Sequence, residues 1–143
     1  MQLDQLYTDI ILEHNQDKRN KRHLLEPTVK KHGHNPNCGD DITLEVKLNG
    51  NVIEDAAYTG AGCAISQASA SMMIDLIKGK TVEEALHYVD LFLGMIRKEV
   101  TDEEELEALE DAFVLQNISN MPARVKCAVL AWRTLKEAVG HNQ

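Results

Sequence analysis

The 143-residue sequence contains no apolar run that approaches the roughly 18 residues of a membrane span. Its start, Met1-Gln2-Leu3-Asp4, lacks the charged and apolar regions of a secretory signal peptide. No series of lysine and arginine residues is interleaved with aromatic residues, and a net charge of -8 opposes binding to phosphate backbones. We therefore expect a soluble, cytoplasmic protein whose partners include neither membranes nor nucleic acids.

Cysteine is also scarce, with three residues in the chain. An odd number cannot pair completely within one chain, and thiols stay reduced in the cytoplasm, so we expect no structural disulfides. A chain of this length buries about 68–70% of the surface that its unfolded form exposes, enough to fold without a disulfide or a metal. No internal repeat, low-complexity segment or linker divides the sequence, which predicts a single domain over residues 1–143. The cysteines therefore need another explanation, or none.

The first part of the chain predicts one helix. Apolar residues recur at helical spacing over residues 3–11, which indicates an amphipathic helix that ends near His14 or Asn15. At this helix end, the charge of His14 would complement the helix dipole. Residues 16–37 lack a periodic pattern, and we expect a surface connection there, with a short strand around residues 28–30.

A β-hairpin is predicted next. Apolar and polar residues alternate over residues 42–48, which is the pattern of a half-buried strand. Asn49-Gly50 supplies the positive φ angles of a tight turn, and residues 52–58 form the returning strand.

Four helices are predicted in the remainder of the chain. An apolar stripe at helical spacing runs over residues 64–77 and Gly79 ends it, while a last helix begins at Pro122 and ends at Gly140. Two further helices begin at Ser/Thr-x-x-Glu capping boxes, Thr81 with Glu84 and Thr101 with Glu104, and extend over residues 82–99 and 102–115. This order of elements predicts an α+β fold in which helices cover one face of a small antiparallel β-sheet.

The three cysteines stand at loops or element ends. Cys38 precedes a strand, Cys63 follows a glycine-rich turn at a strand-to-helix junction, and Cys127 lies near a helix start. Inert buried cysteines usually occupy the middle of an apolar stripe instead. A helix N-terminus favours the thiolate, the form that binds metals and attacks sulfur, and Cys63 and Cys127 could both benefit from it.

Three thiolates make an incomplete tetrahedral metal site, and Asp40 can supply a fourth ligand. Positions two apart lie on the same side of an extended chain, so Cys38 and Asp40 can face one ion. The alternative is three unrelated cysteines, because no C-x-x-C pair is present and long stretches separate the thiols. His32 and His34 could also bind a metal, although histidines in a polar loop are usually solvated.

Glycines flank the cysteines at Gly39, Gly60 and Gly62. Glycine lets the backbone approach a ligand closely or adopt conformations that other residues avoid, although ordinary turns also use it. The glycines at 60 and 62 do not form a phosphate-binding loop, because the later glycine and the Gly-Lys-Ser/Thr ending are missing.

A cysteine nucleophile is the enzymatic alternative. Cys38 with His34 and Asp40 contains the residue types of a cysteine protease site. Nothing in the sequence resembles the substrate pocket that such a site needs.

Three segments, each with one cysteine, resemble the iron–sulfur cluster assembly proteins of the IscU and SufU family. They are Asn-Pro-Asn-Cys-Gly-Asp at residues 35–40, Gly-Ala-Gly-Cys-Ala-Ile-Ser-Gln-Ala-Ser at residues 60–69 and Pro-Ala-Arg-Val-Lys-Cys-Ala at residues 122–128. The opening helix is also similar, so the resemblance covers nearly the whole chain. It implies one IscU/SufU-like domain with a SufE/NifU-like fold.

Departures from the IscU scaffold branch match the SufU branch. Lys126 precedes Cys127 where the scaffold branch has a histidine, and residues 121–126 differ from the Leu-Pro-Pro-Val-Lys segment that recruits a dedicated chaperone. The chain between Cys63 and Cys127 is also longer, with extra helical material around residues 81–120.

The SufU resemblance implies a zinc-dependent sulfur acceptor for a pyridoxal-phosphate cysteine desulfurase. Cys38, Asp40, Cys63 and Cys127 would hold zinc. A histidine of the desulfurase would replace Cys38, whose thiolate would attack the sulfane sulfur of the enzyme's persulfide. The resulting persulfide would pass to a downstream cluster-assembly scaffold.

Basic residues could serve this partner. Arg124 and Lys126, beside Cys127, could contact it or stabilise thiolates, or form a solvated basic edge. The basic cluster of Lys18, Arg19, Lys21 and Arg22 could also help docking. The acidic residues 102–111 are expected to form a solvated face.

Two other functions use the same cysteines. In the first, the three thiolates and Asp40 hold a transient [2Fe-2S] cluster on a scaffold, because thiolates suit zinc and iron–sulfur clusters alike. In the second, a structural zinc domain mediates only protein contacts. A carboxylate ligand and a core large enough to fold without metal disfavour the second.

Overall fold

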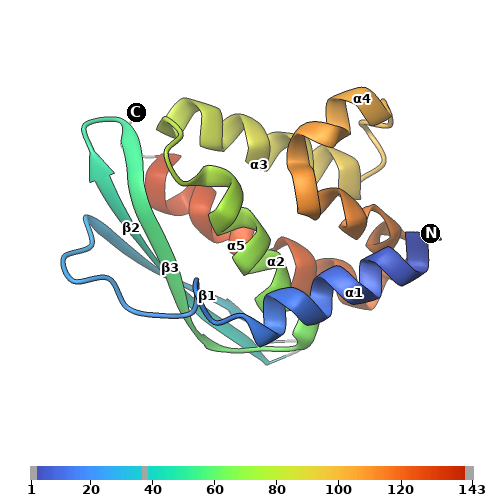
Figure 1. Cartoon of the computed structure of the whole chain (residues 1–143), viewed down its shortest axis with the longest axis horizontal. Coiled ribbons are helices and arrows are strands. Elements are labelled where there is room, and N and C mark those ends of the chain that lie inside the picture. The colour runs from blue at the N-terminus through green and yellow to red at the C-terminus, as the bar shows by residue number, and fades with distance from the viewer. Residues whose placement is uncertain (1–2, 37–38, 141–143) are drawn as a thin grey trace.

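The computed structural model describes residues 3–36 and 39–140, the first five of them by their backbone alone. Along the described chain, one helix comes first, the strands of a single sheet follow, and the remaining helices come last (Figure 1). The elements are α1 (Leu3–Gln16), β1 (Val29–Asn35), β2 (Asp40–Asn49), β3 (Val52–Ala61), α2 (Ala64–Ile77), α3 (Val82–Ile96), α4 (Glu103–Leu106), the 3-10 helix η1 (Glu107–Asn120) and α5 (Pro122–Val139).

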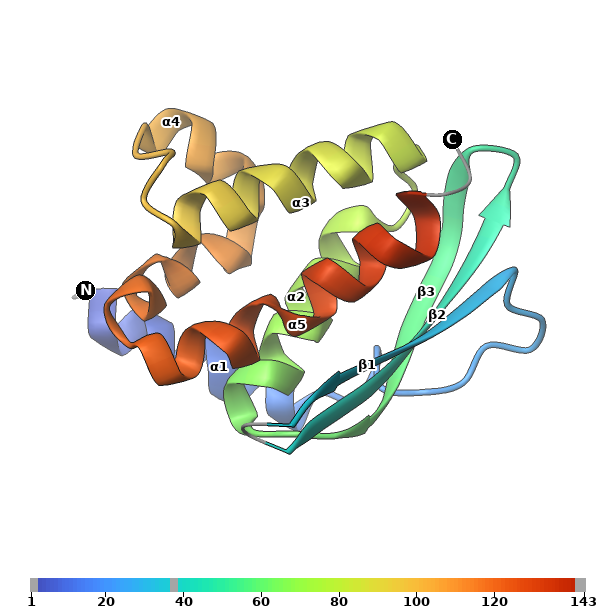
Figure 2. The same ribbon diagram turned by 180° about the vertical axis from the view of Figure 1, so that it is seen from behind.

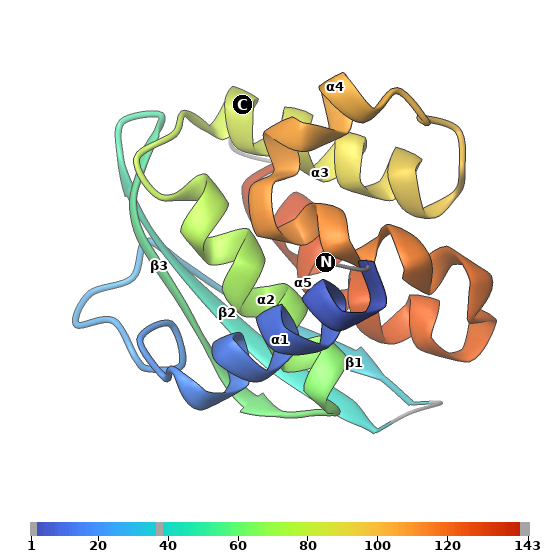
Figure 3. The same cartoon turned by 45° about the vertical axis from the view of Figure 1, so that its right-hand side comes forward.

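The sheet has three antiparallel strands in the order β1-β2-β3. Gly50, with φ of 63°, forms the predicted turn between β2 and β3. Figure 2 shows α5 lying across the sheet, with α3 on the side of α5 away from the strands. Figure 3 shows α1 running beside α2 on the same side of the sheet. The expectation of an α+β fold with helices on one face of a small antiparallel sheet is confirmed.

The prediction for residues 16–37 was wrong in part, because β1 spans Val29–Asn35 and not three residues. Its side chains are mostly basic or histidine, and an edge strand tolerates such polar residues because it pairs on one side only. At Gly33, an added Cβ would lie 2.2 Å from Thr134 Oγ1 of α5. The lack of a side chain there lets the strand lie directly against the helix.

One predicted helix start is confirmed and the other is wrong. Thr81 and Glu84 form the capping box of α3, which ends at Ile96, earlier than predicted and shortly before Lys98 with its φ of 63°. At the second start, Asp102 is the N-cap, and its side chain accepts from the backbone N–H of Glu104. An aspartate beside the threonine supplies the stronger cap.

The predicted helix over residues 102–115 is also wrong. The α-helical part is the four-residue α4, and the 3-10 helix η1 follows, with a break at Glu110, where φ is 52°. Five buried apolar residues recur at every third position, namely Leu106, Leu109, Ala112, Leu115 and Ile118. A period of three matches the three residues per turn of a 3-10 helix, so burying this stripe favours η1 over a regular α-helix. The acidic residues between them are mostly exposed, as expected.

The centre of the core joins α2, α3 and α5. The indole ring of Trp132 on α5 stacks on Phe92 of α3, with ring centroids 4.1 Å apart. Trp132 Nε1 donates to Ser69 Oγ of α2 at 2.8 Å, and Ser69 Oγ donates to the carbonyl of Ala128 at 2.6 Å. The two hydrogen bonds hold α5 against α2 and fix the position of one helix relative to the other. The described part of the chain contains no helix with the length and apolar composition of a membrane span.

Candidate metal centre

Asp40 is the first residue of β2 and is fully buried, with 0% of its surface exposed. The β2–β3 register pairs Asp41 with Ala61, so the start of β2 lies beside the end of β3. Asp40 Oδ1 accepts a hydrogen bond of 2.9 Å from the backbone N–H of Cys63. The carboxylate is therefore held against the strand-to-helix turn.

Cys63 is the N-cap of α2. Its Sγ accepts from the backbone N–H of Ser66 at 3.4 Å, as an N-cap oxygen would in another helix. The turn before it depends on glycine. Gly60 has φ of +118°, and a Cβ there would lie 2.0 Å from the carbonyl oxygen of Asp41. A Cβ at Gly62 would lie 2.8 Å from Asp40 Oδ1, so the predicted need for glycine beside this cysteine is confirmed.

Cys127 lies in the second turn of α5, which begins at Pro122 as predicted. Its side chain is buried, and the hydrogen bond from Ser69 to neighbouring Ala128 places this turn over the start of α2. Cys127 therefore lies beyond the first turn of its helix, whereas Cys63 is the cap of its own helix.

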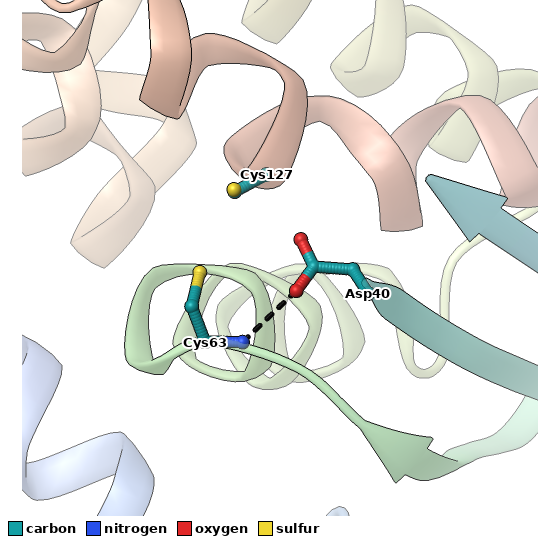
Figure 4. A group of neighbouring side chains, drawn as sticks. All are labelled: Asp40, Cys63 and Cys127. Carbon is teal, nitrogen blue, oxygen red and sulfur yellow. Dashed lines mark hydrogen bonds between the residues drawn. The ribbon is translucent and has the colours of Figure 1, made fainter. Parts of the chain in front are cut away.

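Asp40, Cys63 and Cys127 converge on one space (Figure 4). One carboxylate oxygen and the two Sγ atoms all lie within 4.8 Å of one another. Oδ1 of Asp40 faces the backbone of Cys63, and the other carboxylate oxygen faces Cys127 in Figure 4. Three elements far apart in the sequence, β2, α2 and α5, thus contribute one donor each.

This donor set fits a metal ion. Zinc accepts cysteine and aspartate ligands in a tetrahedron, and thiolates also bind iron–sulfur clusters. Three donors from the described residues leave room for a fourth. Cys38, two positions before Asp40, lies outside the described residues, and its part in the ligand set stays a prediction.

The histidines near Cys38 do not join this group. His32 and His34 lie exposed on β1, 6.2 Å apart between ring centroids, and His32 Nε2 contacts the carboxylate of Asp41. His14 lies in the last turn of α1, as predicted, and its side chain is also buried. Its ring nitrogens lie 2.9 Å from Ser71 Oγ and 3.0 Å from Asp111 Oδ2, so it joins α1 to α2 and η1. No signal in the sequence indicated this role.

Most of the predicted basic docking cluster is engaged within the protein. Arg19 forms ion pairs with Asp75 and Asp17, which raise the pKa of its guanidinium, and Arg22 pairs with Asp55 at 2.8 Å. These side chains hold the segment after α1 to β3 and α2. Lys21 donates to Gln67, Arg22 donates to Asp55, and Arg19 donates to Asp75. These contacts give three of the four residues a structural role, and a docking role for the cluster stays a prediction.

Arg124 and Lys126 lie exposed in the first turns of α5. Within the described ranges, neither side chain forms an ion pair. Lys126 borders a groove of about 500 Å³ between β1 and α5, lined by His34, Asn35, Val125, Lys126, Val129, Leu130 and Arg133. This groove has an apolar floor, basic side chains at its rim and no carboxylate among the described lining residues.

The sequence and the fold both match known proteins. The NifU-like N terminal domain model matches residues 6–143. The zinc-dependent sulfurtransferase SufU of Bacillus subtilis is 43% identical over 142 residues, which are 99% of this chain and 94% of that protein. The iron–sulfur cluster assembly scaffold protein IscU of Thermotoga maritima is 42% identical over 134 residues, 94% of this chain and 92% of that protein.

A crystal structure from thermophilic Fervidobacterium islandicum, described as a SufU and a cluster assembly scaffold protein for the SUF system, has the same fold. Its TM-score is 0.84 at 34% identity, and the match covers 94% of this chain and 97% of that chain. Both the full-length sequence match and the shared architecture place the three cysteine motifs within one known family. The chain therefore belongs to the NifU-like N-terminal domain family, with IscU and SufU.

Proposed function

We propose that this protein is a zinc-dependent sulfurtransferase that accepts sulfur from a pyridoxal-phosphate cysteine desulfurase in iron–sulfur cluster assembly. The convergence of Asp40, Cys63 and Cys127 within 4.8 Å carries this proposal. The chain is similar to SufU of Bacillus subtilis, which is named a zinc-dependent sulfurtransferase, and this similarity supports zinc as the metal. Lys126 before Cys127, where the scaffold branch has a histidine, favours the acceptor over a cluster scaffold.

The metal ligands would be Asp40, Cys63, Cys127 and Cys38. When bound, zinc stabilises thiolates against protonation without redox chemistry of its own. Three of these donors already lie within 4.8 Å of one another, and the backbone N–H of Cys63 orients the Asp40 carboxylate. Burial of Asp40 and Cys127 keeps water away from two of the donors.

Cys38 would be the sulfur acceptor. Its thiolate attacks the terminal sulfur of a persulfide on the desulfurase, and a new S–S bond forms on Cys38. The S–S bond of the donor breaks, and its electron pair leaves with the desulfurase cysteine as a thiolate, so the transfer involves no net oxidation. Cys38 then carries a persulfide, which a downstream cluster-assembly scaffold can take up in the cytoplasm.

The groove beside Cys127 would receive the desulfurase. The whole chain has a net charge of -8, yet Lys126 and Arg133 border this groove and Arg124 lies nearby on α5. A local positive surface on an acidic protein attracts acidic groups of a partner and orients their approach. We therefore assign Arg124 and Lys126 to partner contact.

The sulfur-acceptor function can be tested by adding the anaerobically purified protein, after its zinc and iron content is measured, to a cysteine desulfurase that is turning over cysteine. Bound zinc, strong stimulation of the desulfurase and a persulfide on Cys38 in mass spectrometry are expected, and Cys38→Ser should abolish the last two. A desulfurase that is not stimulated, together with a stable chromophore assembled from iron and sulfide, would instead identify the protein as a [2Fe-2S] scaffold.

The docking role of Lys126 predicts a specific kinetic change. Lys126→Glu should raise the concentration of this protein that half-stimulates the desulfurase by about tenfold, since reversing a contact charge weakens association. Lys30→Glu is the matched control, because Lys30 is also exposed but lies near the opposite end of β1 from the metal centre. Equal effects of the two substitutions would show that only net charge matters, and no effect of either would remove Lys126 from the interface.

A further inference from the structure

Ser66 has a buried hydroxyl that the metal centre so far leaves unexplained. It lies in the first turn of α2, three residues after Cys63, and its exposed fraction is 0%. Its backbone N–H donates to Cys63 Sγ. Its Oγ has no hydrogen-bond partner among the described residues. Of the buried side-chain nitrogen and oxygen atoms in the described part of the chain, only Asn20 Oδ1 is in the same condition.

The hydroxyl lies beside the carboxylate of Asp40. An added Cβ at Gly62 would be 2.8 Å from Asp40 Oδ1 and 3.2 Å from Ser66 Oγ. The two oxygens therefore line the same small space, which stays open because residue 62 has no side chain. Asp40 Oδ1 already accepts from the backbone of Cys63, and a carboxylate oxygen can accept a second hydrogen bond.

An unpaired buried hydroxyl destabilises the state that contains it, so a role in another state of the site would explain its presence. Carboxylates that bind metals are commonly held by a further hydrogen bond, which fixes the orientation of the ligand oxygen. Ser66 is placed for this task, since its own helix starts at the ligand Cys63. Rotation about one side-chain bond moves its Oγ relative to the space above Gly62.

We propose that Ser66 is a positioning residue of the metal centre. In the metal-bound protein, its hydroxyl donates a hydrogen bond to the Asp40 carboxylate, directly or through one water above Gly62. This bond holds Oδ1 on the side of the Cys63 backbone and leaves the other oxygen for the metal. The inference rests on the proposed function only in that Asp40 binds the metal.

Ser66→Ala separates this role from simple packing. Zinc affinity, measured by competition with a chromophoric chelator, should fall by about tenfold or more, the usual effect of removing such a supporting hydrogen bond. Thermal unfolding of the metal-free variant should occur at the same temperature as in the wild type or higher, because an unpaired buried hydroxyl has been removed. A packing role would instead lower the stability of the metal-free protein.

A double-mutant cycle tests whether Ser66 acts through Asp40. In the Asp40→Ala background, Ser66→Ala should cause no further loss of zinc affinity. Thr134→Ala is the control, since it removes a buried hydroxyl that bonds to Leu130 within α5, and zinc affinity should not change. Unchanged affinity in Ser66→Ala, or an equal loss in both backgrounds, would overturn the inference but not the metal site. A wild type without zinc affinity would overturn both.

Discussion

Asp40→Asn should weaken zinc binding by about a hundredfold while the protein stays folded. Asparagine has the same shape and keeps an oxygen that can accept from the backbone N–H of Cys63, but it lacks the charge that a metal ligand supplies. A structural zinc site binds with about 10–16 kcal/mol, so one of four ligands contributes roughly 3 kcal/mol, or about two powers of ten in affinity. Competition with a chelator measures this loss, and circular dichroism checks the fold.

Asp41→Asn is the matched control for the charge. Asp41 is the next residue along β2, is exposed and contacts His32. Its substitution changes the net charge equally, so zinc affinity should stay near that of the wild type. Retention of full affinity in Asp40→Asn would remove Asp40 from the ligand set, and equal losses in both variants would identify a long-range charge effect.

The largest loss of stability is expected for Trp132→Ala. The substitution empties the space of a fully buried indole, removes the stack on Phe92 and leaves Ser69 without its donor. Truncation of a buried aromatic residue to alanine costs about 3–5 kcal/mol. In a domain of this size, the midpoint of thermal unfolding should fall by about 10 °C.

Trp132→Phe keeps a stacked ring but removes the hydrogen bond and part of the buried indole volume. Phenylalanine keeps a ring against Phe92 but cannot donate to Ser69, so we expect a cost of about 1–3 kcal/mol. Unfolding should be measured on metal-free protein, because bound metal adds to the apparent stability. If Trp132→Ala lost no more than Trp132→Phe, the stacking would contribute little and this account of the core would be wrong.

Elements with strong local signals were predictable. The turn at Asn49-Gly50 and the capping box of Thr81 with Glu84 involve residues close in sequence, so their geometry depends little on the rest of the fold. The same holds for Cys63, because glycines before it and an apolar stripe after it mark the end of a strand and the start of a helix.

Elements whose conformation depends on distant contacts were not predictable in the same way. β1 has a polar sequence and becomes a strand because it pairs with β2 and lies against α5 at Gly33. η1 exists because burying one side chain in three offsets its poorer hydrogen-bond geometry. The stripe from Leu106 to Ile118 is present in the sequence, but the capping box of Thr101 with Glu104 predicts an α-helix, whose period of about 3.6 residues does not match the stripe.

The sequence by itself determined the ligand types, the three motifs that carry them, the strand-to-helix turn at Cys63 and the helix start before Cys127. Only the tertiary structure decided that Asp40, Cys63 and Cys127 meet within 4.8 Å. The β2–β3 register brings the first of them to the second, and the packing of α5 on α2 brings the third. The spacing of residues along the chain does not predict these contacts, because they arise from burial of apolar faces far from the site. The same burial placed Ser66 beside the carboxylate.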